Sequence, residues 1–305
     1  MKKYIGLDKV QLLPITPSYI QHRWRCDIGQ TINGIYFRSP LIPATMSSII
    51  SNKMLENLKI NNYFAIQLRK SIETGTIFLS PIAIDSSLED VYKVCELLQA
   101  YNHTQNKIVS IQVANGHMAM VGDVINDAKK MFPEIQFWAG TVAMKDGVQY
   151  LKDYGADAIF LGIGNGSVCA TTPQTGVGCP TFTMIEECSQ VDIPIILAAG
   201  SRNYGDVCKA VAAGCDLVLS GYLFKGCSDL PQSHEYYGEA SKRGKLENNK
   251  QPTFIEGIED MYVNSAGKTS VMVLDEFEQA MQSSMSYLNA SNLTEYRNNA
   301  NFIEV

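Results

Sequence analysis

The chain is 305 residues long, with a formal net charge of −6, 46% hydrophobic residues and 18% charged residues. This balance is typical of a soluble globular protein, and the length suits a single α/β barrel. The net negative charge argues against non-specific binding of nucleic acid, which usually needs a basic face. A small anionic ligand remains compatible with it, because backbone N–H groups at a helix start can hold a phosphate.

The sequence indicates neither secretion nor insertion into a membrane. Asp8 and Lys9 interrupt the apolar residues near the amino terminus before they reach the length of a signal peptide. No run approaches the ~18 consecutive apolar residues of a membrane span. The eight cysteines form no C-x-x-C pair and no zinc-like spacing. We therefore expect free thiols in a cytoplasmic chain.

Short apolar segments alternate with amphipathic ones along the chain. Strands are predicted at 39–45, 62–68, 76–82, 107–113, 135–140, 158–163, 194–200 and 217–222. Their nearly continuous hydrophobicity is typical of parallel strands covered on both faces. Helices are predicted at 86–101, with a capping box from Ser86 to Glu89, and at 120–132 and 205–214. The alternation predicts an α/β fold, a (β/α)8 TIM barrel over residues 1–305, with a doubly wound open sheet as the alternative.

Two segments fall outside this alternation. Residues 1–37 precede the first predicted strand, and residues 228–272, which are polar, charged and rich in tyrosine, follow the last one. A long polar excursion inside a compact domain is usually a functional lid or a solvated insertion. Because this one would rise from the face where barrel enzymes build their sites, we expect a mobile flap. An amphipathic helix over 274–290 would then close the barrel.

One thiol, Cys169, lies in the segment GIGNGSVCATTPQTGVG, residues 162–178. A segment of this composition cannot pack as core and has too much glycine for an ordinary helix. It follows the sixth predicted strand directly, so Cys169 would lie at the carboxyl end of a barrel strand, where catalytic residues gather. Either Cys169 is a small loop residue, or the loop holds a ligand against a nucleophilic thiolate.

The segment resembles the catalytic loop of the IMP dehydrogenase and GMP reductase family, roughly G-I-G-x-G-S-x-C-x-T-R-x-x-T-G-V-G. The resemblance extends to residues 7–14, 113–117, 205–226, 256–259 and 282–293. It implies a catalytic TIM barrel. The pair of regulatory CBS-type modules that many IMP dehydrogenases insert after strand two is absent, since too little chain separates the second and third predicted strands.

The resemblance also implies a covalent chemistry. In this family the cysteine adds to purine C2; a dehydrogenase then passes hydride from IMP to NAD and hydrolyses the adduct, whereas a GMP reductase releases ammonia from GMP and accepts hydride from NADPH. Cys169 would be the nucleophile, and Thr171 would help to activate the water or the departing ammonia. The implied cofactor is NADPH, with NADH or NAD as alternatives, and Gln112 and Asn115 are its candidate contacts on the barrel loops.

Further matching positions imply the phosphate end of a nucleotide site. Ser167 resembles part of the family's phosphate cradle. Gly200 and Gly221 follow the seventh and eighth predicted strands, where barrels often bind phosphate. Tyr236 and Tyr237 would border the same group. The implied partner is a purine nucleoside monophosphate.

Other positions imply contacts to the base and to a cation. Glu256 and Glu259 are candidates for the purine edge, since a carboxylate accepts hydrogen bonds from N1–H and from an exocyclic amine. The backbone carbonyls of Gly164, Gly166 and Cys169 match positions that hold a monovalent cation, such as K⁺, in the family. Family members are commonly tetramers, so a homotetramer is expected.

Several family positions are replaced in this chain. Where strand seven of the family ends D-G-G and its aspartate holds the ribose hydroxyls, this chain has Ala198. The bulky Tyr222 follows the strand-eight glycine, Thr172 replaces the loop arginine, and Gln112 replaces the aspartate of D-V-A-N-G. The family's M-D-T element is Met46–Ser48, M-S-S. The replaced positions therefore concentrate around the sugar and the amine.

One replacement affects the amine chemistry. Compact GMP reductases carry a glutamate where this chain has Lys242, and that glutamate partners the threonine in handling ammonia. Glu239 could substitute if the segment is helical, because residues three apart share a face. Alternatively, Lys242 with a lowered pKa could act as the base, or turnover has been lost.

The combined pattern predicts a GMP-reductase-like enzyme acting on GMP or, because no carboxylate is left to bind a 2′-hydroxyl, on dGMP. Two alternatives stay open. The EGIE segment at 256–259 also resembles a dehydrogenase, which favours an NAD-dependent oxidation of the IMP dehydrogenase type. Three family residues are replaced together: the loop arginine by Thr172, the sugar aspartate by Ala198 and the flap glutamate by Lys242. This combination fits a purine-nucleotide-binding paralogue without catalysis.

Overall fold

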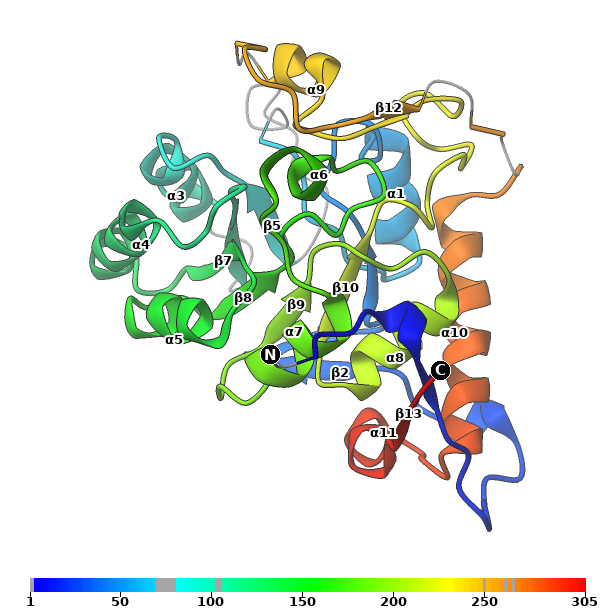
Figure 1. Ribbon diagram of the computed structural model, residues 1–305. Coiled ribbons are helices and arrows are strands. Elements are labelled where there is room, and N and C mark those ends of the chain that lie inside the picture. The colour runs from blue at the N-terminus through cyan, green and yellow to red at the C-terminus, as the bar shows by residue number, and fades with distance from the viewer. Residues whose placement is uncertain (1–2, 70–80, 102–105, 249–250, 261–262, 265–266) are drawn as a thin grey trace.

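Figure 1 shows the computed structural model, which describes residues 3–69, 81–101, 106–248, 251–260, 263–264 and 267–305. Its centre is a curled parallel sheet that contains seven strands in these residues, in the order β4-β10-β9-β8-β7-β6-β5. The strands are β4 (Leu41–Pro43), β5 (Ile82–Asp85), β6 (Lys107–Gln112), β7 (Gln136–Val142), β8 (Ala158–Leu161), β9 (Ile195–Leu197) and β10 (Leu217–Ser220).

Helices cover the outer face of the sheet (Figure 1). They are α1 (Asn52–Ile60), α3 (Val91–Ala100), α4 (Ala119–Met131), α5 (Lys145–Asp153), α7 (Thr181–Cys188), α8 (Tyr204–Ala212), α10 (Ser270–Tyr287) and α11 (Leu293–Asn299). The predicted helices are found with shifted ends. The capping box is wrong: α3 begins after Asp90, which makes no side-chain cap, and the Ser86 hydroxyl donates to the Ser87 carbonyl.

Residues within each strand alternate between two buried clusters. In β7, Trp138 faces the inner cluster while Phe137 and Ala139 face the helices; in β8, Phe160 faces inward and Ile159 outward. The inner cluster of the described residues contains no helical residue, whereas a doubly wound sheet would place helices against both faces. The predicted α/β architecture with a parallel sheet is confirmed, and the curled sheet with its own inner core is TIM-barrel-like.

The second predicted strand, 62–68, continues this alternation with less regular pairing. Phe64 belongs to the inner cluster and Ala65 to the outer one, and a parallel bridge joins Gln67 to Ile84 of β5. The third predicted strand, 76–82, lies largely outside the described residues. The strand that the structure shows there, β5, begins at Ile82, at the end of the predicted range.

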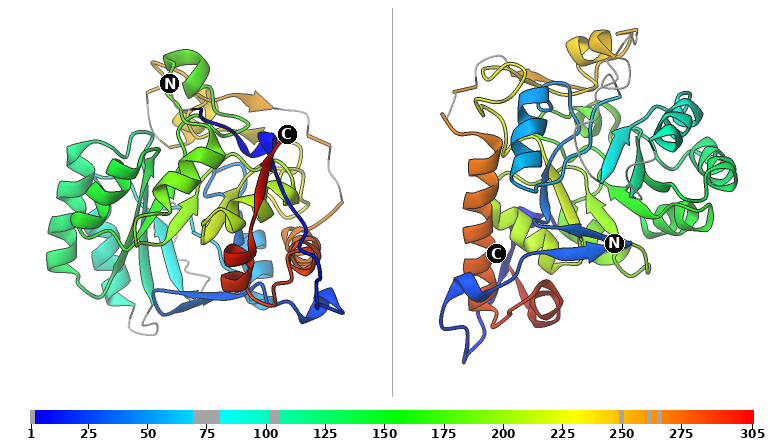
Figure 2. Two further views of the ribbon diagram at one scale, coloured as in Figure 1. Left: turned by 60° about the horizontal axis from the view of Figure 1, so that its bottom comes forward. Right: turned by 180° about the vertical axis from the view of Figure 1, so that it is seen from behind.

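A hairpin closes the amino-terminal end of the sheet, as Figure 2 shows. It consists of β2 (Gln30–Ile32) and β3 (Ile35–Phe37), joined by Asn33 and Gly34, both with positive φ, as a type I′ turn requires. The Asn33 amide donates to the carbonyl of Asp157, just before β8, at 2.7 Å. The hairpin thereby seals the end opposite the expected site. The termini meet on the outside, where β1 (Val10–Leu12) pairs with β13 (Phe302–Glu304).

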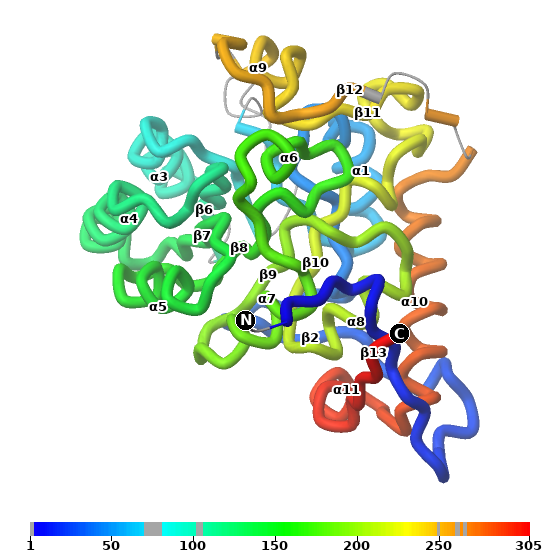
Figure 3. The backbone as a smooth tube through the Cα atoms, in the orientation of Figure 1, coloured from blue at the N-terminus to red at the C-terminus, as the bar shows by residue number. Residues whose placement is uncertain are grey.

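The segment after β10 lies over the other end of the sheet (Figure 3). It contains the short strands β11 (Tyr236–Tyr237) and β12 (Glu259–Asp260), which pair antiparallel, and the helix α9 (Lys242–Glu247). Asp229, which is fully buried, accepts hydrogen bonds from the backbone N–H and hydroxyl of Ser270, at the start of α10. The two ends of the predicted flap region, 228–272, are thus fastened together at its base.

We expect Phe37→Ala to lower the free energy of unfolding by about 3–5 kcal/mol, because its ring is 1% exposed and contacts Phe64 at 4.9 Å between centroids. The matched control is Tyr36→Ala, one residue earlier in β3, whose side chain is 62% exposed. Urea unfolding followed by circular dichroism measures both. Equal effects of the two substitutions would contradict a core formed around the hairpin.

Candidate active site

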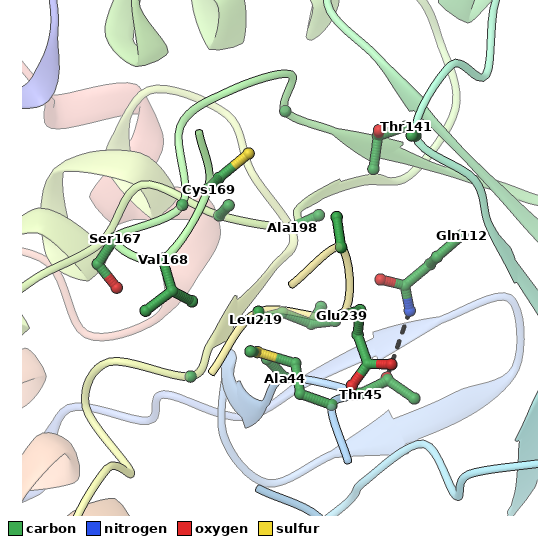
Figure 4. Close-up of a pocket in the computed structure, with 18 of the residues that line it drawn as sticks. Ala44, Thr45, Gln112, Thr141, Ser167, Val168, Cys169, Ala198, Leu219 and Glu239 are labelled. Carbon is green, nitrogen blue, oxygen red and sulfur yellow. Dashed lines mark hydrogen bonds between the residues drawn. The ribbon is translucent and has the colours of Figure 1, made fainter. Parts of the chain in front are cut away.

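A cavity of about 320 Å³ opens at the carboxyl ends of the strands (Figure 4). Its wall is built from the residues that follow β4, β6, β8, β9 and β10, together with the segment after β11. This is the end of the sheet where the sequence predicted a site. It brings together these predicted residues: Gln112, Gly164, Gly166, Ser167, Cys169, Thr171, Ala198, Gly200, Gly221, Tyr222, Glu239 and Glu256.

The Cys169 thiol donates to Thr171 Oγ1 at 3.3 Å, so the two side chains expected to react are in contact. The turn that presents them needs glycine: Gly162 and Gly164 have φ values of +134° and +78°, which side chains with a Cβ rarely adopt. The short helix α6 (Thr171–Thr175) follows at once. The glycine content of this loop therefore has a steric cause.

The flap segment holds the cysteine loop by backbone hydrogen bonds. Ala170 N–H donates to the Glu256 carbonyl at 2.7 Å, and Ile258 N–H donates to the Val168 carbonyl at 2.9 Å. On its other side, Gly238 N–H donates to the Ile258 carbonyl at 3.1 Å. Residues 168–170, 256–258 and 238–240 thus form one ladder, in which Cys169 is paired with residue 257.

Glycine is required inside this ladder. A Cβ at position 238 would lie 2.7 Å from the Val168 carbonyl oxygen, and one at Gly257 would overlap the backbone of Ser241. Because backbone atoms cannot move aside as a side chain can, larger residues would force the strands apart. The ladder therefore fixes where the thiol points.

The structure separates the candidates for the amine chemistry. Glu239 lines the cavity, and its carboxylate accepts hydrogen bonds from the Ser47 backbone N–H and from the Asn248 side chain. Lys242 is exposed on the first turn of α9 and is not one of the described residues that line the cavity. Of the two groups weighed from the sequence, only Glu239 can contact a ligand bound there.

Two other expected residues lie away from the cavity wall. The Tyr237 hydroxyl donates to Glu247 at 2.7 Å, which together with burial raises the pKa of Tyr237. Glu259 is exposed and accepts a hydrogen bond from the Arg243 backbone N–H at 3.0 Å. Among the described residues that form the wall, Tyr236 takes the place expected of Tyr237.

Several hydroxyl groups line the cavity, among them those expected beside a phosphate. The Tyr236 hydroxyl lies 3.1 Å from Ser167 Oγ, and burial raises the pKa of Tyr236, so its phenol is a donor at neutral pH. Ser47 and Ser201 also line the cavity; their hydroxyl oxygens are buried without a hydrogen-bond partner among the described residues. Sequence reasoning missed Ser201, although its position directly after Gly200 was a usable signal.

The wall where the family's sugar aspartate would lie is apolar. Ala198 and Ala199 directly follow β9 and line the cavity, as do Leu219 and Met46. Figure 4 shows Ala198 and Leu219 in this wall. The far side is polar instead. Gln112 donates to Thr45 Oγ1 at 3.3 Å. Sequence reasoning also missed Arg69 and Asp85, which line this side of the cavity with Arg69 Nε 4.0 Å from Asp85 Oδ2.

A second cavity, of about 700 Å³, adjoins the first. The two share Ala114, Ile163, Thr171 and Glu256 in their walls, and the second one includes Asn115 and His117. His117 Nε2 accepts a hydrogen bond from the Ala143 backbone N–H at 3.1 Å, which requires this nitrogen to be unprotonated. Desolvation lowers the pKa of His117 from its usual value, in agreement with that geometry.

Comparisons with known proteins place the chain in a family. A family model described as the IMP dehydrogenase / GMP reductase domain matches residues 82–305. The chain belongs to the IMP dehydrogenase / GMP reductase family. Among curated relatives, the GMP reductases of Bacillus licheniformis and Bacillus subtilis are 32% and 31% identical to it, over 98% of this chain and 95% of theirs. The GMP reductase of an Exiguobacterium species is 32% identical over 97% of this chain and 94% of its own.

The protein is therefore an oxidoreductase of this family, as the cysteine loop predicted. The described residues contain no group of three or more His, Cys, Asp or Glu side chains that could hold a metal ion. None of the helices in that part of the chain is long and apolar enough to cross a membrane. All eight cysteines are free thiols.

The His117 contact predicts a pH dependence of stability. In the folded state the pKa of His117 lies below its usual value of 6.5. The unfolded chain therefore binds a proton at a higher pH than the folded chain does, and protonation favours unfolding. The stabilisation is fully present above pH 6.5 and is lost as the pH drops towards the folded-state pKa. We expect His117→Gln to reduce this loss in urea unfolding between about pH 5 and 7.

The control for this experiment is His22→Gln, whose imidazole is exposed beside Trp24, at 5.7 Å between ring centroids. If the free energy of unfolding depends on pH in the same way in the wild type and in His117→Gln, the neutral imidazole does not stabilise the turn at Ala143.

Proposed function

We propose that the protein is a GMP-reductase-type enzyme that converts a guanine nucleoside monophosphate into the hypoxanthine nucleotide and ammonia, with NADPH as the hydride donor. The observation that carries the proposal is the contact between the Cys169 thiol and Thr171 Oγ1 at the carboxyl edge of the sheet, in a cavity that Glu239 also lines. Relatives named GMP reductase that match nearly the whole chain support the same reaction.

The residues suit the following sequence. The Cys169 sulfur bonds to purine C2, the C2–N bond of the exocyclic amine breaks, and ammonia leaves with the thiol proton. A nicotinamide cofactor bound in the second cavity, beside Asn115 and Thr171, would supply the hydride for C2. The C2–S bond breaks with its electron pair on sulfur, which restores the thiolate. Overall, the guanine nucleotide, NADPH and two protons give the hypoxanthine nucleotide, NADP⁺ and ammonium. Thr171 lies next to the sulfur in every step.

The same cavity would supply contacts for the phosphate and for the base of the nucleotide. Ser167, Tyr236 and the backbone at Gly200 and Gly221 would hold the phosphate, as hydroxyl and N–H donors suit its oxygens. The Glu256 carboxylate would accept from the purine edge. Neither Tyr237 nor Glu259 is needed for these contacts.

The second cavity fits a nicotinamide cofactor. It meets the first at Thr171, so a ring bound there would lie beside the carbon that reacts. Its wall combines the amide of Asn115 with apolar side chains such as Met144 and Val177, which suit a flat ring and a polar carboxamide. Gln112 lines the first cavity, so it would contact the cofactor only where the two cavities meet.

The family also implies a monovalent cation and a tetramer. Carbonyl oxygens of Gly164, Gly166 and Cys169 are chemically suited to K⁺, although the Gly166 carbonyl accepts the Cys169 N–H at 3.1 Å and would be shared. We include both features in the proposal, with a flap over 228–272. Free cysteines fit a reducing cytoplasm.

The apolar wall at Ala198 favours a 2′-deoxyribonucleotide. A ribose 2′-hydroxyl buried against Ala198 and Leu219 would lose its hydrogen bonds to water, which costs about 1–3 kcal/mol. A 2′-deoxyribose has only hydrogen at C2′, so it removes one of the two hydroxyls that would face this wall. The proposed substrate is therefore dGMP in preference to GMP.

The first test is the loss of NADPH absorbance with GMP and with dGMP, using the wild type and Cys169→Ala. We expect turnover with dGMP to exceed that with GMP by about 10-fold, because one unpaired polar group costs about 1–3 kcal/mol and about 1.4 kcal/mol corresponds to 10-fold. Cys169→Ala should abolish turnover with both, since it removes the nucleophile.

Other outcomes separate the alternatives. Preference for GMP would retain the reductase and reject the deoxyribose proposal. NAD reduction by IMP or dIMP, without NADPH oxidation, would identify a dehydrogenase. Binding of nucleotide without any cysteine-dependent turnover would identify a binding protein.

A second test restores the lost carboxylate. Ala198→Asp should raise kcat/KM for GMP relative to dGMP by about 10-fold, because a carboxylate at this position can accept hydrogen bonds from both ribose hydroxyls. The control is Ala199→Ser, in the neighbouring wall position. An unchanged ratio in Ala198→Asp would show that position 198 does not contact the sugar.

A further inference from the structure

The donors already assigned to the phosphate are enough for one phosphate group. A phosphate monoester presents three terminal oxygens. The hydroxyls of Ser167 and Tyr236 lie 3.1 Å apart, and the backbone at Gly200 and Gly221 lines the same cavity. A Cβ at Gly221 would lie 2.9 Å from the Tyr236 hydroxyl oxygen, so these groups are close together. Any further donor beside them exceeds what a monophosphate needs.

Ser201 and Tyr222 add two more hydroxyl groups to the cavity wall. Each directly follows one of the two glycines, and because β9 and β10 pair in parallel, the loops after them lie side by side. Ser201 is 4% exposed, and its hydroxyl oxygen has no hydrogen-bond partner among the described residues. Leaving a buried polar group unpaired is unfavourable, so a ligand oxygen beside Ser201 would be stabilising.

Two cationic side chains lie next to these hydroxyls. The Lys225 ammonium lies 3.9 Å from the centroid of the Tyr222 ring, in a cation–π contact. Arg202 directly follows Ser201. Burial raises the pKa of Tyr236, and the nearby Arg202 guanidinium lowers it, which places this cation close to the phosphate end. In the part of the chain that the structure describes, no ion pair involves either cation.

These cations lie outside the wall of the cavity. Neither Lys225 nor Arg202 is among the described residues that line the two cavities; Arg202 is exposed and Lys225 is partly buried. A ligand group that reaches Lys225 must therefore extend past Tyr222, beyond the part of the nucleotide held at Gly221. The sequence of contacts favours a ligand that is longer at its phosphate end than a monophosphate.

The charge of the cavity itself supports this assignment. The cation among the described wall residues is Arg69, which lies beside Asp85 at the end of β5, next to β6 and Gln112. Figure 4 shows Ser167 across the cavity from Gln112. The positive charge on the Ser167 side therefore comes from residues at the edge of the cavity, where a second phosphate would lie. A lysine ammonium binds a phosphate as a point charge.

We propose that the site continues into a second phosphate subsite, formed by Ser201, Tyr222 and Lys225, and that its substrate is a guanine nucleoside diphosphate. The proposal rests on the proposed function for the guanine end and extends its substrate from the monophosphate to the diphosphate. Lys225, held on the Tyr222 ring, binds the second phosphate, and the two hydroxyls donate to its oxygens. The reaction at purine C2 is unchanged, because the added phosphate lies at the other end of the nucleotide.

The test compares kcat/KM for dGDP with that for dGMP, and for GDP with that for GMP, so that any preference for one sugar cancels. Divalent cations, which bind diphosphates, are left out. We expect the wild type to favour each diphosphate by about 10-fold, the effect of one added hydrogen bond between charged groups. Lys225→Met keeps an unbranched stem on the ring and removes the charge, so it should bring this ratio to about 1.

The matched control is Arg25→Met. The Arg25 guanidinium lies 5.3 Å from the centroid of the Trp24 ring, and the substitution removes the same charge from the same kind of contact. Arg25 lies outside the described residues that line either cavity. This variant should keep the wild-type ratio. A second variant, Tyr222→Phe, retains the ring beneath Lys225 and loses only a hydroxyl, so it should lower the ratio by about 3-fold.

Two results would overturn the subsite. Equal kcat/KM for the mono- and diphosphates in the wild type would show that nothing there binds a second phosphate. An equal loss with both nucleotides in Lys225→Met would assign Lys225 to the first phosphate or to the fold.

Calorimetric titration separates these failures from a failure of the proposed function, because it needs no turnover. If the wild type binds dGDP more tightly than dGMP, loses this difference in Lys225→Met and yet oxidises no NADPH, the second phosphate subsite stands and the reductase is rejected. Turnover of dGMP without any gain for dGDP, in binding or in rate, would reject the subsite and retain the reductase.

Discussion

The site depends on backbone hydrogen bonds between the cysteine loop and the flap. Residues 168–170 follow a strand of the sheet, whereas residues 256–258 arrive after a long excursion, and the two are joined by N–H···O=C contacts of 2.7 and 2.9 Å. Main-chain pairing of this kind is independent of side-chain identity but demands close approach, which explains Gly238 and Gly257. Cys169 and residues 256–258 therefore share one hydrogen-bonded framework.

This framework makes the side-chain differences from the family interpretable. Because the backbone of the cysteine loop is fixed, the replacements at positions 198 and 47 change only the polar groups on the cavity wall. The cavity wall carries the hydroxyl groups of Ser167 and Tyr236, and Ala198 stands where the family has an aspartate. Replacements of this kind can change the preference of a site among substrates without moving its reacting groups.

Much of this could be predicted from the sequence. Continuous apolar segments predicted the parallel sheet, and the glycine-rich segment after the sixth strand predicted the site at its carboxyl edge. Contacts that depend on the folded path of residues 228–272 could not be predicted. Glu239 and Lys242 are close in the sequence, but in the structure Glu239 lines the cavity and Lys242, at the start of α9, is exposed to solvent. For the same reason Tyr236, and not Tyr237, lines the cavity, and the places of Ser201, Arg69 and Asp85 in its wall were not foreseen.

The hairpin that seals the opposite end of the sheet has a consequence for the order of assembly during synthesis. Ile32, Ile35 and Phe37 leave the ribosome early, yet the inner core that buries them includes Leu217 and Leu219, almost two hundred residues later. Phe37 can contact Phe64 earlier, but the segment completes its contacts only after most of the chain has been made, and long-range pairing of this kind is slow. Until then an apolar hairpin stays exposed to other nascent chains, so translation rate and crowding would govern the yield of folded enzyme.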